Sequence, residues 1–117
     1  MRNQYNTGLS GEQIAEDFLV QQGMQTITRR YRGGDGEIDL IMLDQDVIVF
    51  VEVKSRPGGQ RGSGVMAVTP AKQRRLSHAA LAFLVEREWT ERFVRFDVIE
   101  ISRAGILHIP NAFMAAQ

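Results

Sequence analysis

Two segments of the chain space their apolar residues as amphipathic helices do. Within residues 10–22 the apolar positions recur at helical intervals, and they are Ile14, Ala15, Phe18 and Leu19. Ser10, with Gln13 three residues later, is a capping-box pattern that places the start of this helix. A second helix is expected over residues 69–88, because its Thr-Pro start supplies a good cap and then a residue suited to the first helical position.

The other apolar segments are short and bounded by turn residues, which predicts strands. We expect these strands over residues 24–31, 37–43, 47–54, 93–101 and 106–109. Polar or Gly-rich stretches separate them, and a tight turn, Gln45-Asp46, is expected between the second and third strands. The order of helix, three strands, helix and two strands predicts one α/β domain over residues 1–117, with helices covering a sheet.

The hairpin over residues 37–54 carries acidic side chains within the most apolar part of the sequence. Counting back from a two-residue turn places Asp39 opposite Glu52 on one face, because side chains alternate along a strand. The next pair on that face is Glu37 opposite Lys54. The other face then holds only core side chains, namely Ile38, Leu40, Met42, Val49, Val51 and Val53. A longer loop with a bulge is the alternative, and it would change this register.

The opposed pair of Asp39 and Glu52 needs something to offset its repulsion, which burial would strengthen. Protonation of one acid is one solution, and a divalent cation bound between the two acids is another. Hard cations such as Mg²⁺ prefer a few carboxylates together with waters and phosphate oxygens. With such an ion in place, Lys54 could orient the attacking water or stabilise charge that develops on a phosphate. The alternative is structural, with both acids pointing to solvent or pairing with arginines such as Arg95.

An acid on one strand, followed by Glu52-Val53-Lys54 on the next, resembles the active site of the restriction-endonuclease-like nucleases. More closely, several stretches resemble the YraN family, a group similar to Holliday-junction resolvases, and they are GEQIAEDFL, GEIDLIMLD, VFVEVKSR, AVTPAKQRRL, RFDVIEI and NAF. The resemblance runs from about Gly11 to Phe113. It implies a restriction-endonuclease-like α/β fold with a central mixed β-sheet flanked by helices. It also implies Mg²⁺-dependent hydrolysis of DNA phosphodiesters, with branched DNA as the substrate.

Carried over position by position, the resemblance implies a role for each residue of the motif. Asp39 and Glu52 would be the ligands of Mg²⁺, or of Mn²⁺ in its place, and the backbone carbonyl of Val53 could also reach the metal. Lys54 would be the catalytic lysine. The acid on the first helix of such nucleases corresponds to Glu12, although an acid near a helix N-terminus is also favourable by itself.

Lys72 is a further candidate for the catalytic site. Of the fourteen lysines and arginines, only Lys54 and Lys72 are lysines, so these two positions are candidates for a specific need. Lys72 precedes Leu76 by four residues and therefore shares the inner stripe of the second helix. A cation in the first turn opposes the helix dipole, which suggests that Lys72 holds a phosphate or a catalytic acid. Alternatively, its side chain extends past the edge of the core to solvent.

Six arginines are candidates for contacts with a nucleic-acid backbone, and they are Arg30, Arg32, Arg56, Arg61, Arg74 and Arg75. Arg56 and Arg61 belong to a Gly-rich segment, residues 55–64, that directly follows Lys54, and such segments can become ordered on a DNA backbone. Solvated surface is the alternative for these arginines. A non-catalytic nucleic-acid-binding module on a nuclease scaffold is therefore the main rival to an enzyme.

Composition and charge argue against several classes of protein. The formal net charge is +0, which is unlike a general nucleic-acid coat protein but compatible with a basic surface beside an acidic pocket. The chain contains no cysteine, which excludes disulfide frameworks and thiolate metal sites. No apolar run reaches the length of a membrane span and the first residues lack the apolar segment of a secretion signal, so we expect a cytoplasmic protein with no membrane partner. A homodimer would match the symmetry of a DNA junction.

Overall fold

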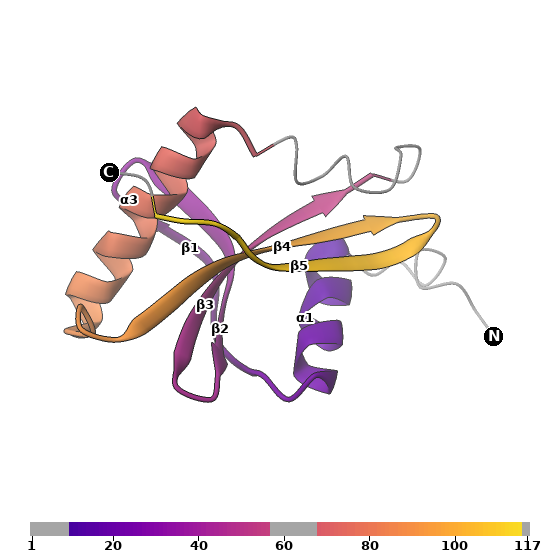
Figure 1. Ribbon diagram of the computed structural model, residues 1–117, viewed down its shortest axis with the longest axis horizontal. Helices are drawn as coiled ribbons and strands as arrows, with labels where there is room; N and C mark the ends of the chain where they lie inside the picture. The colour runs from indigo at the N-terminus through magenta and orange to yellow at the C-terminus, as the bar shows by residue number, and fades with distance from the viewer. Residues whose placement is uncertain (1–9, 57–67, 116–117) are drawn as a thin grey trace.

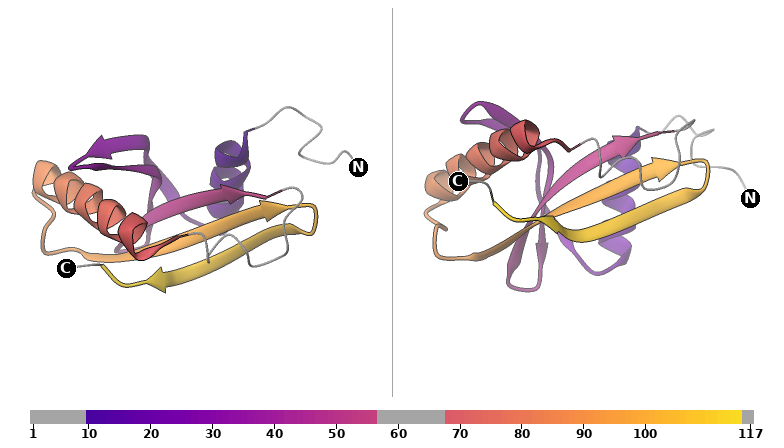
Figure 2. Two further views of the ribbon diagram at one scale, coloured as in Figure 1. Left: turned by 90° about the horizontal axis from the view of Figure 1, so that it is seen from above. Right: turned by 45° about the horizontal axis from the view of Figure 1, so that its top comes forward.

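The computed structural model describes residues 10–56 and 68–115, which form a twisted five-stranded sheet with two helices packed on it (Figure 1). The elements follow in the order α1 (Gly11–Gln21), β1 (Gln25–Gly33), β2 (Gly36–Asp44), β3 (Val47–Ser55), α3 (Pro70–Arg87), β4 (Phe93–Ser102) and β5 (Gly105–Phe113). The two helices lie well apart in both views of Figure 2, and their buried side chains belong to two separate core clusters. Within the described ranges, no helix combines the length and apolar character that a membrane crossing needs.

The sheet is mixed, which confirms the predicted α/β class. Its strands lie in the order β1-β2-β3-β4-β5. Neighbouring strands are antiparallel except β3 and β4, which run parallel to each other. A parallel pair needs a long crossover connection, and α3 lies in that connection. The crossover places α3 on one face of the sheet, where its buried side chains pack against β2, β3 and β4.

Both predicted helix caps are confirmed. Ser10 Oγ accepts a hydrogen bond from the Gln13 backbone N–H at 3.1 Å. Thr69 Oγ1 accepts one from the Lys72 backbone N–H at 3.3 Å, and Pro70 occupies the start of the helix. These bonds satisfy N–H groups that have no partner within the helix, which fixes where each helix begins.

Two strand ends differ from the sequence expectation. The turn between β1 and β2 consists of residues 34–35 alone, because Gly33 still pairs with Gly36. β5 continues to Phe113, although Pro110 cannot donate a hydrogen bond to a neighbouring strand. An edge strand tolerates proline, and β5 is at one end of the strand order.

The predicted core face of the β2–β3 hairpin is right except at one position. Five of its side chains pack in the α1 cluster, and they are Leu40, Met42, Val49, Val51 and Val53. Ile38 instead packs in the α3 cluster. The reason is that pairing between β2 and β3 ends at Leu40 and Val51. Beyond that point the β1–β2 hairpin packs on α3, so closely that a Cβ on Gly36 would overlap the carbonyl oxygen of Arg75.

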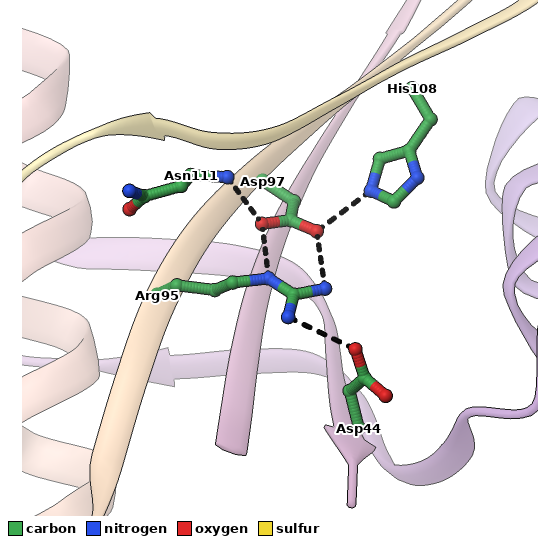
Figure 3. A network of polar contacts seen from close by, with 5 residues as sticks. All are labelled: Asp44, Arg95, Asp97, His108 and Asn111. Atoms are coloured by element: carbon green, nitrogen blue, oxygen red, sulfur yellow. Dashed lines mark hydrogen bonds and ion pairs between the residues drawn. The ribbon is translucent and has the colours of Figure 1, made fainter.

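A buried carboxylate joins the end of the β2–β3 hairpin to β4 and β5 (Figure 3). Asp97 has 0% relative exposure and accepts hydrogen bonds from Arg95 Nε at 3.0 Å and His108 Nε2 at 2.7 Å. It also accepts one from the Asn111 backbone N–H at 2.9 Å, while Arg95 reaches Asp44 at 3.0 Å. Burial raises the pKa of Asp97, but the bonds from His108 and Arg95 outweigh burial and hold the pKa below its usual value.

Asparagine in place of Asp97 should lower the free energy of unfolding by about 3 kcal/mol, because Arg95 and His108 lose their buried anionic partner. The pKa of Asp97 is lowered on folding, so its stabilisation is present at neutral pH and is lost as the pH falls through the folded-state pKa. Urea unfolding at neutral and acidic pH measures both effects. The control Asp44→Asn removes a more exposed partner of Arg95 and should cost less than about 1 kcal/mol. Equal stability of wild type and Asp97→Asn at neutral pH would contradict this account.

Candidate active site

A cleft of about 650 Å³ lies between the β1–β2 hairpin and the first turns of α3. Both predicted acids, Asp39 and Glu52, line it, together with Lys72 and Arg75 from the helix. The hairpin and the helix approach each other along their backbones at Gly36, as described above. The cleft is therefore formed mainly by the β1–β2 hairpin and α3, and β3 contributes Glu52. The hairpin and the helix are far apart in the sequence but packed closely in the fold (Figure 2).

Asp39 lies where the regular pairing of β2 with β3 stops. The predicted register forms from the turn up to Leu40 and Val51. At the next position, Asp39 Oδ2 accepts a hydrogen bond from the Val53 backbone N–H at 2.8 Å, so a side-chain oxygen satisfies a strand N–H. On the adjacent strand, Arg30 has a φ of 52°, an uncommon value for a residue other than glycine. The site is thus formed at an irregular part of the sheet.

The carboxyl groups of Asp39 and Glu52 lie close enough for each to shift the pKa of the other. Burial and the negative charge of Glu52 raise the pKa of Asp39 to about 7, against an opposing effect of the Val53 N–H. Asp39 therefore carries its proton for part of the time at neutral pH. Without a bound cation, this proton offsets the repulsion that the sequence predicts for the pair.

Glu52 keeps its negative charge because two lysines contact it. The residue is 5% exposed, and its Oε2 lies 3.2 Å from Lys54 Nζ and also contacts Lys72 Nζ. Burial raises the pKa of Glu52, but hydrogen bonds with Asp39 and Lys72 outweigh burial and lower the pKa. Burial and the nearby Lys72 ammonium lower the pKa of Lys54, against the attraction of Glu52. The structure therefore gathers four of the five predicted catalytic residues in one cluster.

Glu12 lies at the margin of this cluster and does not line the cleft. From the first turn of α1, its Oε1 accepts a hydrogen bond from Arg30 Nε at 2.9 Å. It lines a smaller hollow of about 270 Å³ with Glu16 and Arg29. Its charge nevertheless contributes to the raised pKa of Asp39, so the two acids are close enough to interact.

Of the five candidate arginines that the structure describes, two line the cleft, and they are Arg32 and Arg75. Arg32 Nε lies 3.5 Å from Glu37, and the Arg32 side chain is largely exposed while that of Glu37 is about half exposed. An exposed pair of this kind contributes little to stability. Arg32 is therefore available to an anionic ligand that enters the cleft.

The other candidate arginines are placed differently. Arg30 pairs with Glu12, and Arg74 is exposed on α3 outside the cleft lining. Arg56 is half-buried and donates its backbone N–H to a carbonyl of β4 at 2.7 Å. Arg61 lies outside the described residues, as does most of the predicted Gly-rich segment.

The donor set fits a hard divalent cation, although it is small. Among the described residues, no group of three or more His, Cys, Asp or Glu side chains is arranged to hold a metal ion. Mg²⁺ does not need such a group, because it is usually bound through one or two carboxylates plus waters and substrate phosphates. Asp39 and Glu52 supply two carboxylates in contact beside an open cleft. These two residues, with the carbonyl of Val53 next in the chain, could hold Mg²⁺ or Mn²⁺.

Sequence reasoning missed a further buried acid, Glu16 on α1. It is 5% exposed and accepts hydrogen bonds from Arg29 Nε at 2.8 Å and Thr26 Oγ1 at 2.6 Å. The hydrogen bond from Arg29 is the main reason that the pKa of Glu16 is lowered. Glu16 therefore fixes α1 on β1, and its place beside Ala15 at the edge of the apolar stripe was the available signal.

Comparison with known proteins assigns the chain to a family. The family described as "Uncharacterised protein family UPF0102" matches residues 11–101. The chain belongs to the UPF0102 family. It is 42% identical to a UPF0102 protein of Geobacter metallireducens, over 93% of each chain. It is 44% identical to a UPF0102 protein of Symbiobacterium thermophilum, over 92% of this chain and 96% of that protein.

The UPF0102 match confirms the YraN-like resemblance at the level of the family. A UPF0102 protein of Pelobacter propionicus is also similar, with 43% identity over 95% of this chain. The matched range contains every candidate residue of the site, from Glu12 to Arg75. The family description states no activity, so the chemistry follows from the residues of the site.

In this UPF0102 protein, Asp39→Asn should increase stability at alkaline pH. Between the ordinary pKa of 3.8 and the folded-state value of about 7, the folded protein binds more protons than the unfolded chain, so wild-type stability falls as the pH rises. Asparagine removes this loss while still accepting a hydrogen bond from Val53. The gain over wild type should be about 2 kcal/mol near pH 8 and small near pH 4, measured by urea unfolding. Glu37→Gln, at an exposed acid of the same cleft, is the control and should show no such pH-dependent gain.

Proposed function

We propose that this UPF0102 protein is a metal-dependent endonuclease that hydrolyses phosphodiester bonds in DNA. The observation that carries the proposal is the contact between a buried carboxylate, Glu52, and a half-buried one, Asp39, beside two lysines at an open cleft. Acids held in contact are destabilising, and a raised pKa with a specific charged partner in a cleft is typical of functional sites. Packing alone gives no reason to retain such a pair.

Asp39 and Glu52 are the proposed ligands of Mg²⁺, with the Val53 carbonyl as a further oxygen. When bound, the ion supplies Lewis-acid polarisation of the phosphodiester and favours deprotonation of a nearby water. Asp39 must lose its proton before it can act as a ligand. Because its pKa is about 7, ion binding should strengthen as the pH rises through neutrality.

Lys54 is the proposed catalytic lysine. Its side chain is 16% exposed and its ammonium lies 3.2 Å from Glu52 Oε2, which fixes it beside the proposed ion site. From there it can orient the attacking water or stabilise the negative charge that develops on the phosphate. Arg32 and Arg75 at the cleft supply positive charge that attracts a DNA backbone.

Branched DNA is the proposed substrate class, supported by the resemblance of the chain to the YraN family, a group similar to Holliday-junction resolvases. A four-way junction is symmetric, so a homodimer with two equivalent clefts would cut opposite strands. Glu12 is proposed to assist from the margin of the site, because its charge already acts on Asp39.

Labelled four-way junctions incubated with Mg²⁺ test the proposal. Glu52→Gln and Lys54→Ala should each lower the cleavage rate by about 100-fold or more, because one loses a metal ligand and the other a group that stabilises transition-state charge. Glu37→Gln is the matched control, since it neutralises an exposed acid that lines the same cleft. Its cleavage rate should stay close to that of the wild type.

Failure of the assay would have a clear meaning. Intact junctions with wild type and Lys54→Ala alike, in Mg²⁺ and in Mn²⁺, would refute the nuclease. Salt-sensitive junction binding that is equal in wild type and Glu52→Gln would then favour the non-catalytic module, which binds through its arginines. If linear duplex DNA were cut at the same rate as a junction, the proposed preference for branched DNA would be refuted. The proposed nuclease activity would stand.

A further inference from the structure

Lys72 occupies the side of Glu52 that faces the cleft. Lys54 and Lys72 both contact Oε2 of Glu52, but only Lys72 is among the residues that line the cleft. The Lys72 side chain is 31% exposed, against 16% for Lys54. The two ammonium groups therefore share one carboxylate oxygen and differ in their access to an incoming ligand.

Lys72 and Lys54 also reach Glu52 from different elements. Lys54 is fixed on β3 beside Glu52, whereas Lys72 reaches the same oxygen from the first turn of α3. That turn contains no acidic residue, and the helix dipole disfavours a cation at this end. The contact with Glu52 is thus what holds the Lys72 ammonium in place. A flexible four-carbon side chain lets the ammonium move without a change in the backbone.

We propose that Lys72 is a counter-ion of Glu52 that a divalent cation displaces, and that the displaced ammonium then binds a substrate phosphate in the cleft. The inference rests on the proposed function, because it takes Asp39 and Glu52 as the ion site. Two cations on one carboxylate oxygen repel each other strongly at short distance. Arg32 and Arg75 make the cleft the place where a phosphate would collect.

The proposed displacement couples the binding of the cation to the binding of DNA. A bound cation frees Lys72 for a phosphate, and DNA that engages Lys72 removes a competitor from Glu52. By linkage, DNA must tighten cation binding by the same factor by which the cation tightens DNA binding. The DNA-free protein therefore binds the cation weakly, and the site becomes fully loaded when substrate is present.

Calorimetric titration of the DNA-free protein with Mn²⁺ tests the displacement directly. Lys72→Met keeps most of the side chain and removes the charge, so Mn²⁺ should bind on the order of tenfold more tightly than to wild type. Lys72→Arg retains the competing charge and should stay near wild type. Arg75→Met is the matched control, because it removes one positive charge from the same helix and the same cleft. Its Mn²⁺ affinity should change far less.

The outcomes separate this inference from the proposed function. Equal Mn²⁺ affinity in wild type and Lys72→Met, together with loss of Mn²⁺ binding in Asp39→Asn, would overturn the displacement and leave the ion site intact. No Mn²⁺ binding in either wild type or Lys72→Met would overturn both proposals. Thermal unfolding of each variant establishes that the compared proteins are folded.

The predicted coupling has its own readout in DNA binding. Four-way junctions are titrated with and without Mn²⁺ in a Lys54→Ala background, in which the proposed mechanism makes cleavage slow compared with the time of the titration. Mn²⁺ should tighten junction binding in this background, and the gain should disappear when Lys72→Met is added. If Mn²⁺ increased junction affinity by the same factor with and without Lys72→Met, the proposed binding of a phosphate by Lys72 would be overturned.

Discussion

Two carboxylates held in contact, largely away from water, are the constraint on which the rest of the site depends. Asp39 and Glu52 are compatible with a folded protein only because a proton and two ammonium groups offset their repulsion. The compensating groups come from different elements, since Lys54 belongs to β3 and Lys72 to α3. The charge balance of the cluster is therefore a property of the tertiary structure. It exists only when the helix is packed on the hairpin.

The sheet accommodates this cluster because the regular pairing of β2 with β3 stops next to it. β2 and β3 form a conventional antiparallel ladder up to Leu40 and Val51, and this part lies in the core. One residue later the strands lose that pairing, and the freed N–H of Val53 is taken by the carboxylate of Asp39. A residue that would have been an ordinary strand position thus faces a cleft. The buried Asp97 network contacts the opposite end of the same hairpin, where Arg95 bonds to Asp44.

Local patterns were sufficient to predict the order of the elements, the caps and the hairpin register from the turn up to Leu40 and Val51, because each depends on residues that are neighbours in the sequence or across one tight turn. The predicted pairings of Asp39 with Glu52 and of Glu37 with Lys54 lie beyond the point where regular pairing stops. The parity of that turn already put Asp39 and Glu52 on one face. Other features depend on where the β1–β2 hairpin meets α3, which no local pattern encodes. Ile38 therefore packs in a different core cluster from the one predicted, and Glu12 pairs with Arg30 at the margin of the site. The partners of Glu16 likewise lie on a strand whose placement was not predictable from spacing.

The close approach of Gly36 to the carbonyl of Arg75 limits the width of the cleft. With no side chain between the two backbones, strand and helix are already near the smallest separation that main-chain atoms permit. Replacement of side chains elsewhere cannot narrow the gap at this point, and any larger residue at the contact can only widen it. The cleft thus has a lower limit of width at this point, set by van der Waals contact between backbone atoms.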